Sequence, residues 1–331
     1  MSVPFPGEWF DRRTYHHARY ADLPALVEAK RFRGLSVSVC LPTRNEASTV
    51  GTIVSVIRDD LMRRFPLVDE IVVMDSMSTD GTVEAAREAG AVVHQDRDVL
   101  PELEPLGGKG DALWKSLFVL SGDLFVFIDA DIRNFDPHFV YGLLGPLLLE
   151  DGVDYVKAYY ERPIGVASGE LEATGGGRVT ELVARPLINL FFPWLAGVVQ
   201  PLSGEYAGTR EAFTSVPFFT GYGVEFGLLV DIAERFGLER MAQVDLDVRV
   251  HRNQSVPELS RMAVGVLQAA MLRLQTLGRI ELRGDMERLY HQFGPGAGGH
   301  EREVSLIEIR ERPPAVSMPA YRWATRGVDP L

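Results

Sequence analysis

Cysteine and lysine are both scarce in this chain of 331 residues. The one cysteine, Cys40, cannot form an internal disulfide, and a single thiol excludes a structural zinc site built from several cysteines. Cys40 lies in an apolar run and is expected to be a small core side chain. Among 34 basic residues, lysine occurs only at 30, 109, 115 and 157, so a lysine in a loop is conspicuous.

Long apolar runs and a basic surface are also lacking. The most hydrophobic stretch, residues 186–202, contains Asn189, Pro193 and Gly197 and is shorter than the roughly 20 apolar residues that a spanning helix needs. The first twenty residues lack the apolar region of a signal peptide. A formal net charge of -12 argues against a general nucleic-acid binder. We therefore expect a cytoplasmic protein with no membrane span and no nucleic-acid partner.

The composition is that of a globular protein with a large core, since 46% of the residues are hydrophobic and 24% are charged. In the first half, short apolar runs alternate with helical patterns. The runs predict strands at 37–41, 71–74, 91–94 and 124–128. The patterns between them predict helices at 47–65, 82–89 and 111–120, with Gly90 as a left-handed cap. This alternation predicts an α/β fold with a Rossmann-like, mostly parallel sheet flanked by helices.

The pattern is looser after residue 131. Strands are expected at 155–160 and 243–250, and helices at 179–190, 224–236 and 258–277. The glycine-rich segment 294–299 is expected to be a flexible break, and the Arg/Pro-rich tail to wrap over the body or exchange with a second copy. We expect four parts: an N-terminal segment 1–34, a nucleotide-binding half 35–131, an acceptor-binding half 132–256, and a helical C-terminal extension 257–331.

The acidic pair Asp129-Ala130-Asp131 closes the strand predicted at 124–128. Open α/β sheets bind their ligands at the carboxyl ends of the strands. Mg²⁺ is typically held by one or two carboxylates together with substrate phosphates, so the pair indicates a metal-diphosphate site. A solvated turn is the alternative, because aspartate also favours turns.

Other polar turns are expected at the same sheet edge: Pro42 to Glu46 after the first strand, Asp75-Ser76 after the second, and the glycine-flanked Lys109. The first turn has no G-x-G-x-x-G pattern, which disfavours a dinucleotide fold. It also lacks the glycine-rich basic turn of a sugar-nucleotide pyrophosphorylase. A phosphate loop is excluded because Gly110-Asp111 follows the lysine.

These segments carry a resemblance. Residues 42–46, 75–82, 108–110 and 129–131 together resemble the nucleotide-sugar half of GT-A glycosyltransferases. Residues 175–180, 221–225 and 250–254 resemble the glucosyl- and mannosyl-3-phosphoglycerate synthases, and the resemblance extends over about residues 35 to 280. It implies a retaining enzyme that moves glucose or mannose from a nucleotide diphosphate sugar, UDP-glucose or GDP-mannose, to 3-phosphoglycerate. The sequence leaves both choices open.

For the donor, the resemblance implies that Pro42, Thr43 and Glu46 hold the base and ribose. The resemblance places Asp75 and Ser76 beside them. Lys109 neutralises phosphate or contacts the base; a solvated lysine at a helix start is the alternative. The implied donor-binding set is completed by Asp129, Ala130, Tyr222, Glu225 and Arg249.

For the metal, the resemblance implies Mg²⁺ or Mn²⁺ ligated by Asp131 and His251, while Asp129 contacts ribose or sugar. For the acceptor, it implies an anion site at a helix start formed by Gly177, Arg178, Thr180 and Asn253; a flexible glycine-rich loop is the alternative. The implied catalytic set is Asp131, Lys109, Glu225 and His251.

Two mechanisms account for retention. In same-face attack, which we favour, the leaving phosphate oxygen takes the acceptor's proton. Double displacement needs a carboxylate nucleophile, for which Glu225 is the only candidate.

Three other functions compete with the synthase. An inverting polyprenyl-phosphate sugar transferase predicts membrane association through 186–202, and a non-catalytic nucleotide-sugar sensor predicts no product. A dimerisation module explains only the helix at 258–277, which is also compatible with a homodimeric enzyme.

Overall fold

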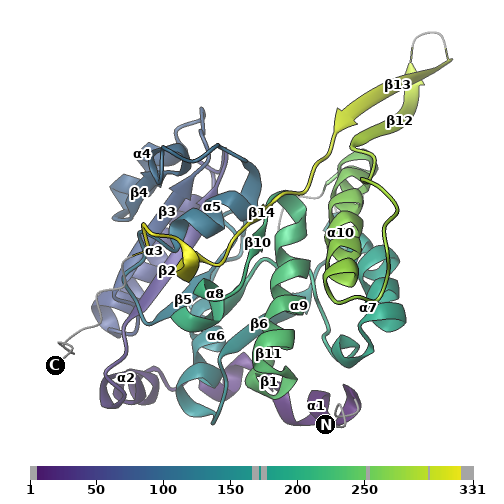
Figure 1. The fold of residues 1–331 in the computed structure, drawn as a ribbon. Coiled ribbons are helices and arrows are strands. Elements are labelled where there is room, and N and C mark those ends of the chain that lie inside the picture. Colours follow the sequence, from purple (N-terminus) through teal and green to yellow (C-terminus); the bar gives the residue numbers. More distant parts are fainter. Residues whose placement is uncertain (1–5, 166–170, 173–176, 251–253, 297–298, 322–331) are drawn as a thin grey trace.

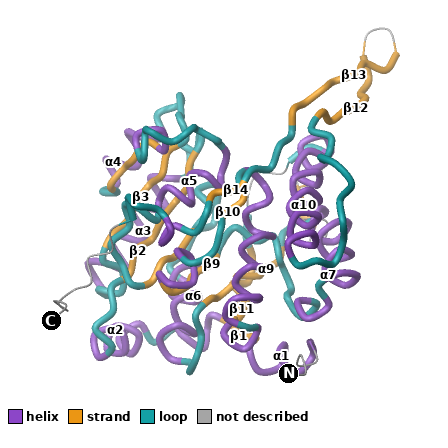
Figure 2. Tube along the Cα trace, in the orientation of Figure 1, coloured by secondary structure: helices purple, strands orange, loops and turns teal. Residues whose placement is uncertain are grey.

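The computed structural model describes residues 6–165, 171–172, 177–250, 254–296 and 299–321. Its centre is an eight-stranded sheet in the order β1-β11-β6-β9-β5-β2-β3-β4 (Figures 1 and 2). The strands are β1 (Thr14–His16), β2 (Val37–Thr43), β3 (Glu70–Asp75), β4 (Val92–Gln95), β5 (Leu124–Phe127), β6 (Tyr155–Glu161), β9 (Tyr206–Thr209) and β11 (Met241–Val248). All neighbours are parallel except β9, which is antiparallel to β5 and β6. The predicted α/β fold with a mostly parallel sheet is confirmed.

Helices cover both faces of this sheet (Figure 1). Side chains of a strand alternate between faces, and β5 illustrates the result: Phe125 and Phe127 enter one buried cluster, whereas Leu124 and Val126 enter the other. The first cluster is closed by α5 (Gly108–Ser116), α7 (Arg185–Phe191), α9 (Val224–Phe236) and α10 (Val256–Thr276). The second is closed by α2 (Leu23–Phe32), α3 (Val50–Val56), α4 (Thr82–Ala89) and α6 (His138–Leu149). The remaining α-helices are α1 (Pro6–Arg13) and α8 (Arg210–Thr214).

The first half follows the sequence prediction closely. All four strands are present within two residues of the expected bounds, and helix α4 has the predicted bounds, closed by Gly90 at φ 106°. The helix predicted at 47–65 begins three residues later, at Val50, and continues as a π-helix over Ile57–Arg64. The helix predicted at 111–120 begins earlier, at Gly108, so that Lys109 lies in its first turn.

The prediction of a flexible break at 294–299 is wrong for the residues that the structure describes there. Leu289–Gly296 (β12) and Gly299–Leu306 (β13) pair as an antiparallel hairpin that extends away from the body (Figure 1). Pro295 lies opposite His300 in this register. A two-stranded ribbon tolerates proline because each strand has one unpaired edge.

The C-terminal tail packs against its own chain. This is the first of the two arrangements expected for it, wrapping over the body or exchange with a second copy. Glu311–Arg312 (β14) pairs with Phe218–Phe219 (β10). Arg312 Nε donates to Asp111 Oδ1 at 2.7 Å, and Trp114 Nε1 donates to the Pro313 carbonyl at 2.7 Å. We call residues 309–318 the C-terminal strap. It fastens helix α5 to the second half of the chain.

Candidate active site

A cavity of about 460 Å³ lies at the carboxyl edge of β2 and β5. Its wall comes from the turns that follow these strands, the first turns of α5 and α9, the segment after β11, and one side of α10. Most of the predicted site residues line it: Pro42, Thr43, Glu46, Ser76, Lys109, Asp129, Ala130, Asp131, Gly177, Arg178, Thr180, Tyr222, Glu225 and Arg249.

Three predicted residues are not in this wall. His251 and Asn253 lie outside the described residues. Asp75 is fully buried beneath the cavity, where its carboxylate accepts hydrogen bonds from Thr43 Oγ1 at 3.0 Å and Gln95 Nε2 at 3.0 Å. It also accepts from the backbone N–H of Ser78 at 2.9 Å. The structure therefore assigns Asp75 to the support of the turns after β2 and β3, rather than to the cavity surface.

Lys109 connects two acidic groups inside the cavity. Its Nζ lies 2.5 Å from Asp129 Oδ1 and 2.7 Å from Glu225 Oε1, and its side chain is 25% exposed. Burial opposes the charged form, but the two carboxylates outweigh it and raise the pKa of Lys109 above its usual range. Lys109 is thus a fixed positive charge, and the alternative of a freely solvated lysine is wrong.

Arg249 holds the acidic pair from the other side. One NH2 group donates to Asp131 Oδ1 at 2.5 Å and to Asp129 Oδ2 at 3.1 Å. Its Nε lies 3.2 Å from Oε1 of the fully buried Glu205, which also accepts a hydrogen bond from the Tyr160 hydroxyl. Burial raises the pKa of Asp129, but Lys109 and Arg249 lower it well below its usual range, so the group is a carboxylate.

Glu225 stands in the first turn of α9 and is 7% exposed. A helix N-terminus favours a negative charge, and Lys109 supplies the countercharge. Glu225 is therefore held in the cavity wall by Lys109 rather than surrounded by solvent.

Gly204 permits the close packing behind Asp129. A Cβ atom at this position would overlap the Asp129 carboxylate. Glycine is thus the residue that allows the chain before β9 to pass directly behind the acidic pair.

The residues expected to bind the acceptor lie on another part of the same wall. Gly177 has φ +74° and its carbonyl accepts from Glu181 N at 3.0 Å, while Thr180 is buried. An Arg178 NH2 group donates to the Gln254 carbonyl at 3.0 Å. The helix predicted at 179–190 begins here as a π-helix, Thr180–Ala184, and continues as α7.

Several wall residues were missed by the sequence analysis. Arg162 follows β6 and donates to the Tyr160 hydroxyl at 2.9 Å, so the rule that ligand-binding residues follow parallel strands identifies it in retrospect. The other wall residues that were not predicted individually are Arg44, Gly108, Val179, Gly221 and Gln254, which lie in the motifs of the resemblance, and Leu202, Gly204, Leu259, Met262 and Val266, which do not. The last three belong to the apolar face of α10, which reads as core in the sequence.

The charges suit an anionic ligand. The wall contains five cationic side chains, Arg44, Lys109, Arg162, Arg178 and Arg249, and four carboxylates, Glu46, Asp129, Asp131 and Glu225. This local excess of one positive charge contrasts with the net charge of -12 for the whole chain. Concentrated cations in a concave site attract phosphate-bearing ligands.

Fold and site together define a nucleotide-sugar glycosyltransferase of the GT-A type. The sequence profile of the family described as glycosyl transferase family 2 matches residues 38–166. Glucosyl-3-phosphoglycerate synthase of Petrotoga mobilis is 44% identical over 315 residues, covering 94% of this chain and 95% of that protein. The enzyme of the same name from Mycolicibacterium smegmatis is 48% identical, covering 86% and 90%. The chain belongs to the glucosyl-3-phosphoglycerate synthase family.

Solved structures agree. Mannosyl-3-phosphoglycerate synthase from Rubrobacter xylanophilus superposes with a TM-score of 0.87 at 42% identity, covering 96% of this chain and 100% of that chain. Glucosyl-3-phosphoglycerate synthase from Mycobacterium tuberculosis, in complex with Mn²⁺, UDP and glucosyl-3-phosphoglycerate, has a TM-score of 0.79 at 41% identity, covering 92% and 99%. The family resemblance read from the motifs is therefore confirmed.

Within the described part of the chain, every helix is too short or too polar to traverse a lipid bilayer. This includes α7, which lies in the stretch that a membrane-associated transferase would have used.

Proposed function

We propose that the protein transfers a hexose from a nucleotide diphosphate sugar to 3-phosphoglycerate. The observation that carries the proposal is that Lys109, Arg249, the Asp129–Asp131 pair and Arg178 all line one cavity. A diphosphate and a small anionic acceptor both fit such a wall. Relatives named for glucosyl and for mannosyl transfer are similarly close, at 44% and 42% identity, so identity does not select the sugar.

We assign the donor to the side of the cavity formed by the turns after β2 and β3 and by the first turns of α5 and α9. Pro42, Thr43, Glu46 and Ser76 line the cavity, and we assign the base and ribose to them. Lys109, Tyr222 and Glu225 line it as well; we assign the phosphates to Lys109 and the sugar to Tyr222 and Glu225. The acceptor is assigned to Gly177, Arg178 and Thr180, with Asn253 as a further candidate.

The residues present also fit a divalent cation. Asp131 is partly exposed, with 28% of its side chain accessible, and Arg249 donates to its Oδ1. Carboxylate oxygens are the ligands that Mg²⁺ and Mn²⁺ prefer. We propose Asp131, with His251, as the protein ligands. A bound cation there would offset the charge that develops on the departing diphosphate.

The chain's own groups support same-face attack. Glu225 is engaged by Lys109 at 2.7 Å, which makes its carboxylate a poor nucleophile and a good holder of the lysine. Lys109 stabilises negative charge that grows on the leaving phosphate. The acceptor's proton passes to a phosphate oxygen of the leaving group.

The decisive experiment is a panel of four donors, UDP-glucose, GDP-glucose, UDP-mannose and GDP-mannose, offered with 3-phosphoglycerate. Each reaction is run with Mn²⁺, with Mg²⁺ and with excess EDTA, and product is measured by mass spectrometry. We expect product with at least one donor, abolished by EDTA and restored by added metal. Binding of donor without any product would favour a nucleotide-sugar sensor and contradict the proposal.

We also propose that the enzyme is a cytoplasmic homodimer. The β12–β13 hairpin carries exposed apolar side chains at Leu289 (51%), Phe293 (68%) and Leu306 (69%). An isolated two-stranded hairpin is marginal in water, which favours a second copy as its support. Light scattering after size-exclusion chromatography tests this: wild type should have the mass of two chains, and Phe293→Asp should shift toward one.

A further inference from the structure

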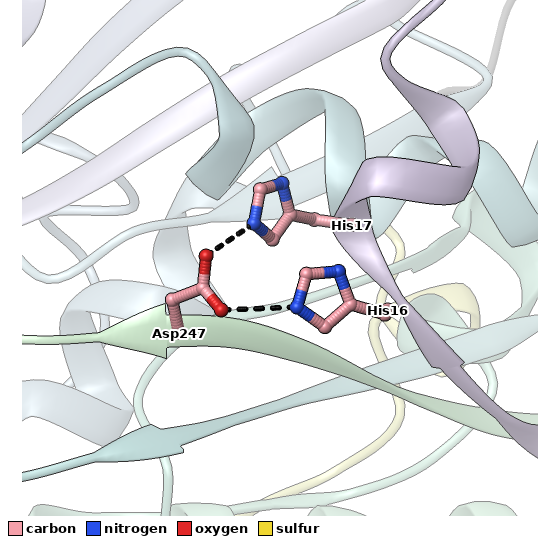
Figure 3. A group of neighbouring side chains, drawn as sticks. All are labelled: His16, His17 and Asp247. Carbon is pink, nitrogen blue, oxygen red and sulfur yellow. Dashed lines mark hydrogen bonds and ion pairs between the residues drawn. The ribbon is translucent and has the colours of Figure 1, made fainter.

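A cluster of two histidines and one aspartate lies at the edge of the sheet, and none of the three lines the active-site cavity (Figure 3). His16 ends β1, and His17 begins the 3-10 helix His17–Tyr20 that follows. Asp247 lies on β11, which pairs in parallel with β1. The change from strand to helix between the two histidines lets both rings face the same carboxylate.

The distances bring three ligand atoms together. His16 Nε2 lies 2.9 Å from Asp247 Oδ1, and His17 Nε2 lies 2.7 Å from Asp247 Oδ2. One ligand atom from each residue lies within 4.8 Å of the others. The side chains of His16 and Asp247 are 48% and 55% exposed, so a solvated ion can reach them. Asp247 adopts φ +62°, uncommon for a residue other than glycine.

The second ring nitrogens decide how readily each histidine can coordinate. Metal-bound histidine donates its other N–H to an acceptor. His17 satisfies this, because its Nδ1 lies 3.3 Å from the Tyr141 hydroxyl and its ring packs against His138 with centroids 4.4 Å apart. His16 Nδ1 instead accepts from the Ala18 backbone N–H at 3.1 Å. His16 must give up this bond to coordinate through Nε2, so His17 and Asp247 are the primary pair.

We propose that His16, His17 and Asp247 bind one divalent transition-metal ion of the Zn²⁺ class, with water completing its coordination. Two imidazoles and a carboxylate suit Zn²⁺, Co²⁺ or Ni²⁺ better than Mg²⁺, which prefers oxygen ligands. The ion links β1 to β11 two residues before Arg249. The role of this ion is structural, because its ligands lie outside the cavity to which we assign hexose transfer.

The test counts bound Zn²⁺ in metal-stripped protein by equilibrium dialysis and elemental analysis. All variants carry Asp131→Asn, which removes a carboxylate of the candidate catalytic metal site. We expect this background protein to retain one Zn²⁺ more than the same protein with Asp247→Asn or His17→Gln. His94→Asn, a histidine on β4 outside the cluster, is the matched control and should retain the ion. The melting temperature of the background protein should rise with Zn²⁺, and the two cluster variants should lose that rise.

Two further measurements accompany the Zn²⁺ counts. Each variant's melting temperature without metal shows whether it folds, and His16→Gln should lower Zn²⁺ affinity at least about 10-fold without abolishing binding. Equal Zn²⁺ counts and equal thermal shifts in background, Asp247→Asn and His17→Gln proteins would overturn the proposal. The cluster would then be a hydrogen-bonded clamp on Asp247 alone.

Discussion

Arg249 donates to Asp131 at 2.5 Å, so the carboxylate that we propose as a metal ligand is already oriented before any cation arrives. Arg249 is 3% exposed and is itself held by Glu205. A ligand fixed by such a partner needs little reorganisation on binding. The cost is that the cation must compete with the guanidinium for negative charge.

Replacing Asp131 by Asn should abolish most turnover. The amide keeps the shape and one oxygen but loses the charge that a divalent cation requires. We expect kcat/KM to fall by roughly 100-fold or more, because charge stabilisation at a reacting centre has that magnitude. Initial rates at saturating Mn²⁺ measure the loss. Asp98→Asn, an exposed acidic residue outside the cavity, is the control, and equal rates in both variants would contradict the proposed role.

Replacing Glu225 by Gln separates the two mechanisms. The amide oxygen can still accept the hydrogen bond from Lys109, but it cannot act as a nucleophile. Same-face attack predicts a reduced yet measurable rate, on the order of 10- to 100-fold below wild type. Single-turnover assays with mass spectrometry of the intact protein provide the measurement. Complete inactivity, together with a trapped sugar adduct on the wild-type enzyme, would instead establish double displacement.

Replacing Arg178 by Lys should weaken acceptor binding selectively. A guanidinium binds phosphate or carboxylate through two parallel hydrogen bonds, which an ammonium cannot reproduce. We expect KM for 3-phosphoglycerate to rise about 10-fold, while KM for the donor stays within about twofold. Arg185→Lys is the control, since this residue lies on α7 outside the cavity. A change confined to the donor's KM would show that Arg178 serves the other substrate.

The buried Lys157 should make the free energy of unfolding depend on pH. It is 2% exposed and donates to the Ser203 carbonyl at 2.8 Å, and burial lowers its pKa to about 7. The unfolded chain keeps this proton up to about pH 10. Between about pH 7 and 10 the unfolded state therefore binds more protons, so stability rises with pH, and below pH 7 the destabilisation is complete.

Lys157→Met removes this titration. We expect the variant to gain stability over wild type at pH 7, on the order of a few kcal/mol, and to gain less at pH 10. The lost bond to the Ser203 carbonyl offsets about 1 kcal/mol of this gain at every pH. Urea unfolding at pH 7, 8, 9 and 10 measures both curves. Parallel curves across this range would refute the assignment.

The parts of the fold that sequence predicted best are those governed by local pattern. Apolar runs such as 124–128 are long enough to identify strands, and the rule that ligands bind at their carboxyl ends brought Pro42 and Asp129 to one site. Strand β9, by contrast, is four residues long, and its Tyr-Ala-Gly-Thr sequence has no alternation. Glu205, just before β9, was therefore missed.

Ion pairs between residues that are far apart in the sequence could not be predicted for another reason. Lys109 and Glu225 meet only because α5 and α9 begin at the same cavity, and no spacing in the chain encodes that approach. The same holds for Arg249 and Glu205, whose contact depends on the antiparallel insertion of β9. The family resemblance named Arg249 as a donor-site residue, but the partner that holds it came only from the structure.

The C-terminal strap has a consequence for the order in which the molecule is completed during synthesis. Asp111, two residues after Lys109 on α5, accepts its bond from Arg312, about two hundred residues later in the chain. A ribosome makes the strands and helices of the first half long before it makes this arginine. The helix that presents Lys109 thus reaches its final bonding only after Arg312 has been made, so a nascent chain that has already folded its nucleotide half still lacks a finished site.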